Sequence, residues 1–151
     1  MLSLNDVFAT CAEILGTKLP PDAAEDSFSF LQTILGKSHQ PHRDHIINHS
    51  VGGEFAYREG PWKLVFRNLS ANLNQSRGKP RVVELYNLDA DIGEKNNLAE
   101  RETEKVRQLT AKLRESIARG SSRPDAQGVN DAEVVVDSTQ RLRWAEARRT
   151  P

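Results

Sequence analysis

Residues 53–66 read GEFAYREGPWKLVF, and this stretch decides the fold of the chain. Apolar side chains alternate with other residues on both sides of Glu59-Gly60-Pro61, as they do in half-buried β-strands. The Gly-Pro pair is typical of a tight turn. The segment therefore predicts an antiparallel hairpin, in which residues 55–58 pair with residues 62–66.

Two further strands flank this hairpin. Residues 45–49 precede it across a Gly52-Gly53 turn, and residues 81–86 follow it after a polar stretch. Four short strands with short links predict an antiparallel meander, whose apolar face needs a cover. The expected cover is a helix over residues 102–119, where one stripe of apolar side chains runs among charged ones: Val106, Leu109, Leu113 and Ile117.

The chain begins with another predicted helix, over residues 5–15, with Ser3 or Asn5 as its N-cap and Gly16 just after its end. A second short helical turn is expected to end at Gly36. The predicted fold class is therefore α+β, a small four-stranded antiparallel sheet covered by a C-terminal helix. The first helix has an apolar face at helical spacing: Val7, Phe8, Cys11, Ile14 and Leu15.

The bulk composition excludes several classes of partner. Lys plus Arg equals Asp plus Glu at 21 each, so no overall charge favours nucleic acid or an anionic membrane surface. No apolar run is long enough to span a bilayer. The single cysteine permits no internal disulfide and gives no information on the compartment.

Three groups of residues follow one another in an order that is known from a protein family. The first group lies in residues 6–36, the second is the hairpin segment 53–64, and the third lies in residues 84–98. In this order they resemble the C-terminal part of a type I sulfatase. The residues that carry the resemblance are Asp6-Val7-Phe8-Ala9-Thr10, Glu13-Ile14-Leu15-Gly16, Leu19-Pro20, Glu25-Asp26-Ser27, Leu31 to Gly36, Gly53 to Leu64, Glu84-Leu85-Tyr86-Asn87-Leu88, Asp91, Glu94 and Asn97-Leu98.

The resemblance implies a division of the chain. Residues 1–40 would be a remnant of the end of the catalytic domain, residues 41–120 the C-terminal subdomain, and residues 121–151 a loose tail. Met1 falls inside the family's pattern, as in a fragment or a misplaced start. The implied role is to complete the substrate cleft of a sulfuric ester hydrolase. The alternative is a freestanding, non-catalytic binding module, which would need a self-sufficient apolar face.

The resemblance also implies a chemistry that this chain cannot carry out alone. Type I sulfatases use a formylglycine, made from the cysteine of a Cys-x-Pro-x-Arg sequence, together with calcium. Cys11 is followed by neither the Pro nor the Arg of that sequence, and its position on the apolar helix face predicts a small buried core residue. We therefore expect no catalytic residue and no cofactor in the chain. Its expected partner is the missing catalytic domain, and a sulfate ester would bind only to the complete enzyme.

Four histidines form the most conspicuous cluster: His39, His42, His45 and His49. On a helix, the last three would share a face and could bind zinc. Pro41 and the Ile46-Ile47 pair favour an extended chain instead, so no metal site is expected. The resemblance places His49 at the rim of the substrate cleft, although hydrogen bonding within the sheet is an alternative role.

Overall fold

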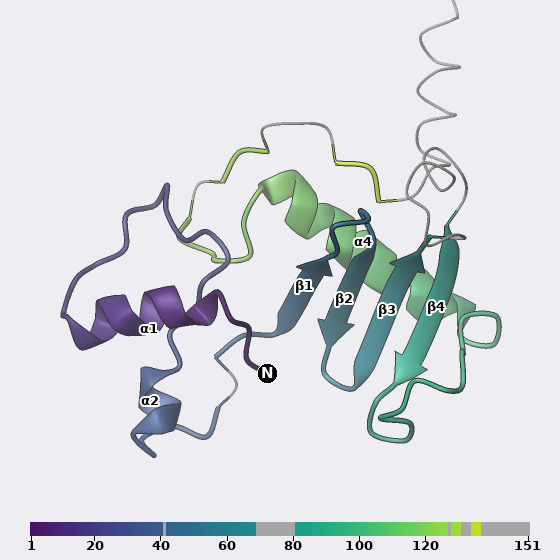
Figure 1. Cartoon of the computed structure of the whole chain (residues 1–151), viewed down its shortest axis with the longest axis horizontal. Coiled ribbons are helices and arrows are strands. Elements are labelled where there is room, and N and C mark those ends of the chain that lie inside the picture. The colour runs from purple at the N-terminus through teal and green to yellow at the C-terminus, as the bar shows by residue number, and fades with distance from the viewer. Residues whose placement is uncertain (41, 69–80, 127, 131–133, 137–151) are drawn as a thin grey trace, which may run out of the picture. The chain divides into compact units, whose positions relative to one another are not determined.

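The computed structural model describes residues 1–40, 42–68, 81–126, 128–130 and 134–136, and it has the predicted α+β fold (Figure 1). Each predicted element is present. The ends of the four strands and of the first and last helices lie within one residue of those expected, and the second helical turn ends at Ile34, two residues before Gly36. The helices are α1 (Asp6–Ile14), α2 (Leu31–Ile34) and α4 (Thr103–Arg119), and the strands are β1 (His45–His49), β2 (Phe55–Glu59), β3 (Trp62–Arg67) and β4 (Val82–Asn87).

The chain divides into two compact units. The first lies within Met1–Ile46 and Arg114–Ala132, and the second lies within Ile47–Leu113 and Glu133–Pro151. Strand β1 and helix α4 each contribute residues to both units. The family boundary expected after residue 40 stays a prediction.

The sheet is a meander in the order β1-β2-β3-β4. Its register places Tyr57 opposite Leu64 and Leu64 opposite Leu85, so the three side chains form one row across the second unit. Tyr57 is 2% exposed, and the two leucines are fully buried. Gly60 has φ +55° in the β2–β3 turn, a backbone conformation that glycine adopts without steric cost.

Helix α4 covers one face of the sheet, as predicted (Figure 1). Leu109 is 2% exposed and Leu113 is fully buried, whereas Val106 and Ile117 are half-buried. The residues of α4 up to Leu113 belong to the same unit as strands β2 to β4. The apolar core of the second unit is therefore closed by its own chain.

The loop after β4 is held by side-chain hydrogen bonds. Asp91 Oδ2 accepts from the backbone N–H of Lys95 at 2.8 Å and from that of Asn96 at 2.7 Å. Lys63 Nζ on β3 lies 2.7 Å from Glu94 Oε1 and forms an ion pair with it. The loop is thus a turn stabilised by a carboxylate.

Helix α1 differs from the expectation in which of its faces is buried. Asp6, Ala9 and Thr10 are buried, while the predicted apolar face is open. Cys11 is exposed, so the prediction of a buried core cysteine is wrong within this chain. The reason is that polar contacts of Asp6 and Thr10 hold the opposite face inward. The exposed fractions on the apolar face are Val7 45%, Phe8 60%, Ile14 62% and Leu15 77%.

The N-terminus of α1 is also capped differently. Asn5 stands at the N-cap position, but its side chain makes no capping hydrogen bond. Instead, Ser27 Oγ accepts from the backbone N–H of Ala9 at 2.9 Å and donates to the Asn5 carbonyl at 2.6 Å. A serine 18 residues from Ala9 along the chain therefore bridges the Ala9 N–H and the Asn5 carbonyl, which stand in the i and i−4 positions of a helical hydrogen bond.

The start of the expected loose tail is packed. Ser121 and Arg123 are buried, and the Arg123 N–H donates to the Glu25 carbonyl at 2.9 Å. The Ser122 N–H donates to Asp26 Oδ1 at 2.8 Å. Residues 121–123 are thus anchored within the first unit, whereas Trp144 and the basic run around it lie outside the described residues.

Candidate functional site

The β1–β2 turn brings two basic side chains to one point in the second unit. His49 ends β1, is exposed, and packs its ring against Phe55 with the centroids 4.4 Å apart. Gly53 has φ +79°, and a Cβ at this position would lie 3.3 Å from Arg81 Nη2 and 3.9 Å from His49 Nε2. The glycine therefore leaves open a space that an imidazole and a guanidinium both approach.

Two contacts position the guanidinium of Arg81. Nη1 donates to the Val136 carbonyl at 2.6 Å, and the guanidinium carbon lies 6.0 Å from the centroid of the Phe55 ring. An imidazole and a guanidinium that flank one aromatic ring offer N–H donors to an oxygen-rich or anionic group. Within the described residues, the pair of His49 and Arg81 is the arrangement that best suits the role expected of His49 at the rim of a substrate cleft.

Sequence reasoning selected His49 and missed Arg81. The arginine stands 32 residues later, immediately before β4, and nothing in its neighbours marks it as functional. It comes near the β1–β2 turn because the antiparallel register places the start of β4 at the same end of the sheet as the start of β2, with Phe66 on β3 opposite both Phe55 and Val83. The pairing is a consequence of the topology.

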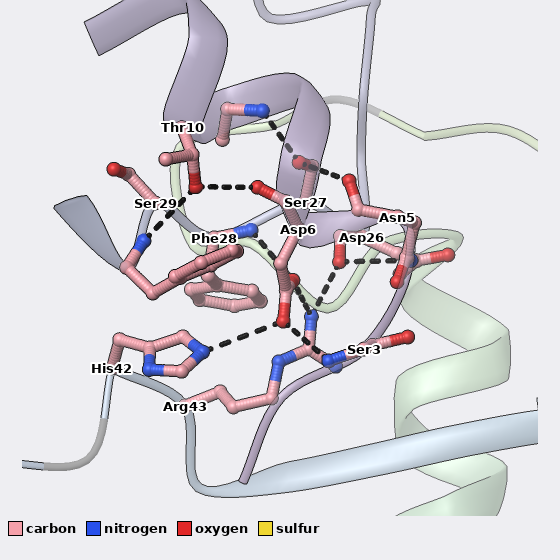
Figure 2. A network of polar contacts seen from close by, with 12 residues as sticks. Ser3, Asn5, Asp6, Thr10, Asp26, Ser27, Phe28, Ser29, His42 and Arg43 are labelled. Atoms are coloured by element: carbon pink, nitrogen blue, oxygen red, sulfur yellow. Dashed lines mark hydrogen bonds and ion pairs between the residues drawn. The ribbon is translucent and has the colours of Figure 1, made fainter. Parts of the chain in front are cut away.

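A second polar cluster lies in the first unit and is centred on Asp6 (Figure 2). Asp6 is fully buried and accepts hydrogen bonds from the Ser3 N–H at 2.8 Å and from the Phe28 N–H at 3.0 Å. Arg43 Nη2, itself buried, donates to Asp6 Oδ1 at 2.5 Å and to the Asp26 carbonyl at 2.6 Å. Because these contacts tie together three chain segments, we interpret the cluster as architectural.

The remaining histidines do not gather into one site. His42 Nε2 lies 3.4 Å from Asp6 Oδ2, and its ring is 5.9 Å from that of Phe30. His45 Nε2 lies 3.4 Å from Ser116 Oγ. Among the residues that the structure describes, no group of three or more His, Cys, Asp or Glu side chains could hold a metal ion. The zinc-binding interpretation thus gains no support from the described residues.

No helix in the described part of the chain is both long enough and apolar enough to cross a bilayer. The longest, α4, carries charged residues along its exposed face and uses its apolar stripe to cover the sheet.

Comparisons with known proteins point to one class of enzyme. No protein-family model matches the chain. It is 36% identical over 117 residues to the N-acetylgalactosamine-6-O-sulfatase of Bacteroides thetaiotaomicron, a match that spans 75% of this chain and 23% of the relative. The chain therefore spans about a quarter of the length of this curated relative.

Two solved structures share the fold. One, designated BT33336S-sulf, comes from work on the metabolism of multiple glycosaminoglycans by Bacteroides thetaiotaomicron. It matches with a TM-score of 0.63 and 35% identity, over 76% of this chain and 24% of that protein. The other, Ps i-CgsB, matches with a TM-score of 0.53 and 17% identity, over 96% of this chain and 28% of that protein. The second likeness concerns the fold alone.

Proposed function

Because this chain is homologous to the C-terminal part of a sulfatase, we propose that it serves as the C-terminal subdomain of a sulfuric ester hydrolase and completes its substrate cleft. The substrate in this proposal is a sulfated carbohydrate, which is the class named for the curated relative. The catalytic centre would belong to the part of the enzyme outside the matched region. The chain would supply a wall of the cleft and no reacting group.

The main observation that supports this proposal is the open apolar face of α1. Four large apolar side chains of one helix are between 45% and 77% exposed, while the opposite face of the helix is fixed inward by buried polar contacts. An isolated domain rarely leaves so many neighbouring apolar groups in water, because their burial is favourable. We propose that the catalytic domain of the sulfatase covers this face. The match to less than a quarter of the relative leaves ample chain for that domain.

The family's cofactors do not fit the residues of this chain. Cys11 is followed by Ala12-Glu13-Ile14-Leu15, which lacks the Pro and Arg of the formylglycine sequence. No acidic cluster suited to calcium is present among the described residues. In this proposal both groups belong to the catalytic domain, so no reaction step is assigned to the chain.

His49 would contact the substrate at the rim of the cleft. It is exposed, its ring packs against Phe55, and Arg81, immediately before β4, approaches the same space. Such a residue binds a sugar hydroxyl or an anionic group of the substrate equally in the ground state and in the transition state. Its loss should therefore raise KM and leave kcat nearly unchanged.

A chimeric enzyme tests the proposal. The matched region of this chain would replace its counterpart in the Bacteroides N-acetylgalactosamine-6-O-sulfatase, and the kinetics would be measured with a sulfated sugar. We expect activity, a rise in KM of about tenfold for His49→Ala, and no change for His39→Ala, a second exposed histidine. A folded but inactive chimera would disprove the cleft role. An active chimera that is indifferent to His49→Ala would disprove the rim assignment alone.

A further inference from the structure

The turn that joins β1 to β2 is closed by two backbone hydrogen bonds. The Gly53 N–H donates to the Ser50 carbonyl at 2.9 Å, and the Ser50 N–H donates to the Glu54 carbonyl at 2.9 Å. The turn starts immediately after His49, the last residue of β1. The conformation of the turn therefore determines where β1 ends and where the imidazole of His49 is held.

The residues at the tip of this turn do little to restrict its backbone. Gly52 and Gly53 have no side chain to limit φ and ψ, and each glycine loses more conformational freedom on folding than any other residue. The side chain of Val51 is fully exposed, so it does not anchor the turn by packing. A turn of this composition needs contacts from outside its tip to keep one conformation.

The Glu54 carboxylate supplies such contacts. Its Oε1 accepts from the backbone N–H of Asn68 at 2.9 Å, and its Oε2 accepts from Ser50 Oγ at 3.2 Å. Ser50 Oγ in turn accepts from the Glu54 N–H at 3.1 Å. The carboxylate thus joins the first residue of the turn to the residue that follows β3. Hydrogen bonds to an ionised carboxylate are stronger than those between neutral groups.

Asn68 makes a second connection to the same turn. Its Nδ2 donates to the Gly52 carbonyl at 2.8 Å. Because β3 pairs with both β2 and β4, the chain that leads to Asn68 is held by the sheet. All of these residues belong to the second unit. Glu54 and Asn68 therefore clamp a glycine-rich turn to the most firmly paired part of the sheet.

Taking the rim role of His49 from the proposed function, we propose that Glu54 is a positioning residue for the substrate site. Its carboxylate holds the β1–β2 turn, and the turn holds the His49 ring against Phe55, where the ring centroids are 4.4 Å apart. A loose turn lowers the fraction of molecules in which His49 is correctly placed, and the apparent affinity for the substrate falls with that fraction. Because the chain supplies no reacting group, kcat is not affected.

NMR of the 151-residue chain tests the effect on the ring directly. We expect NOEs between the His49 and Phe55 rings, which Glu54→Ala should weaken by about twofold or more because the correctly placed fraction falls. Glu54→Gln keeps an oxygen for the Asn68 N–H and should preserve the NOEs, as should Glu100→Ala at an exposed position of the same unit. If Glu54→Ala fails to fold, Asn68→Ala, which removes one hydrogen bond to the turn, replaces it in the comparison. NOEs of full strength in the clamp variant would overturn the proposal.

The chimeric sulfatase distinguishes positioning from a general loss of stability. We expect Glu54→Ala to raise KM by about threefold to tenfold with kcat nearly unchanged, and Glu54→Gln to restore KM. The effect has an upper limit, because a residue that acts only through His49 cannot cost more than His49→Ala does. The double variant His49→Ala/Glu54→Ala should therefore have the same KM as His49→Ala alone.

The outcomes separate the role of Glu54 from the proposed function. A further rise in KM when Glu54→Ala is added to His49→Ala would overturn the positioning role and leave the cleft role intact. So would an unchanged KM for Glu54→Ala in a chimera that responds to His49→Ala. An inactive chimera, or one that is indifferent to His49→Ala, would instead count against the proposed function, and the NOEs would then decide whether Glu54 holds the ring.

Discussion

Truncation of Leu109 to Ala tests the assignment of α4 as the cover of the sheet. Leu109 is 2% exposed and lies on the face of α4 that packs toward the sheet. The change removes three buried carbon groups at about 0.8 kcal/mol each, and a cavity term adds to this transfer cost. We therefore expect the free energy of unfolding to fall by about 2–5 kcal/mol. For a small domain this is a large fraction of the total stability.

Urea denaturation followed by tryptophan fluorescence measures the loss. Ile92→Ala is a matched control, because that side chain is 81% exposed, and we expect it to change the stability by less than about 0.5 kcal/mol. Trp144 lies outside the described residues and within the predicted loose tail, so we expect Trp144→Ala to change the stability little. If Trp144→Ala were more damaging than Leu109→Ala, the C-terminal segment would have to pack on the sheet, and the covering role of α4 would be wrong.

Three further predictions concern the first unit and the chemistry of the chain. Asp6→Asn should cost about 3–5 kcal/mol, because it leaves the buried Arg43 without its anion, whereas Asp22→Asn at an exposed position should cost less than 1 kcal/mol; thermal unfolding compares the two. Cys11 should react fully with a thiol reagent in the native chain, and a slow reaction limited by unfolding would contradict an open α1 face. The purified chain should not hydrolyse a chromogenic aryl sulfate, with or without calcium, and turnover that persists in Cys11→Ala would reveal a catalytic centre that we have missed.

The second unit could be predicted from the sequence almost residue by residue. Residues 53–66 alternate in polarity around a Gly-Pro turn, and α4 repeats its apolar residues at helical spacing, so local pattern and tertiary burial agree. Leu109 and Leu113 of the predicted apolar stripe are buried, and so is Leu64 in the predicted hairpin. Where the local polarity pattern and the tertiary burial agree in this way, the periodicity of the sequence is sufficient to predict the fold.

The polar contacts of the first unit could not be predicted in this way. Asp6 bonds to Arg43 across 37 positions, and the Ser122 N–H bonds to Asp26 across 96. No local spacing encodes such pairs, since they depend on how distant loops meet. The same holds for Arg81 and His49, which both approach Gly53 because of the register of the sheet.

Helix α1 shows why the failure of one sequence rule is informative. The rule that the apolar face of a helix points inward holds for α4 and fails for α1, although both helices have a clear apolar stripe. In α1 the inward face is fixed by the buried Asp6 carboxylate, whose removal from Arg43 would be costly, so the helix cannot simply rotate to bury Phe8 and Leu15. Both faces of α1 are therefore specified, one by hydrogen bonds within this chain and the other by apolar contacts that the described residues do not supply. A helix with two specified faces is suited to the boundary between two packed bodies, which is the position that we propose for it in a sulfatase.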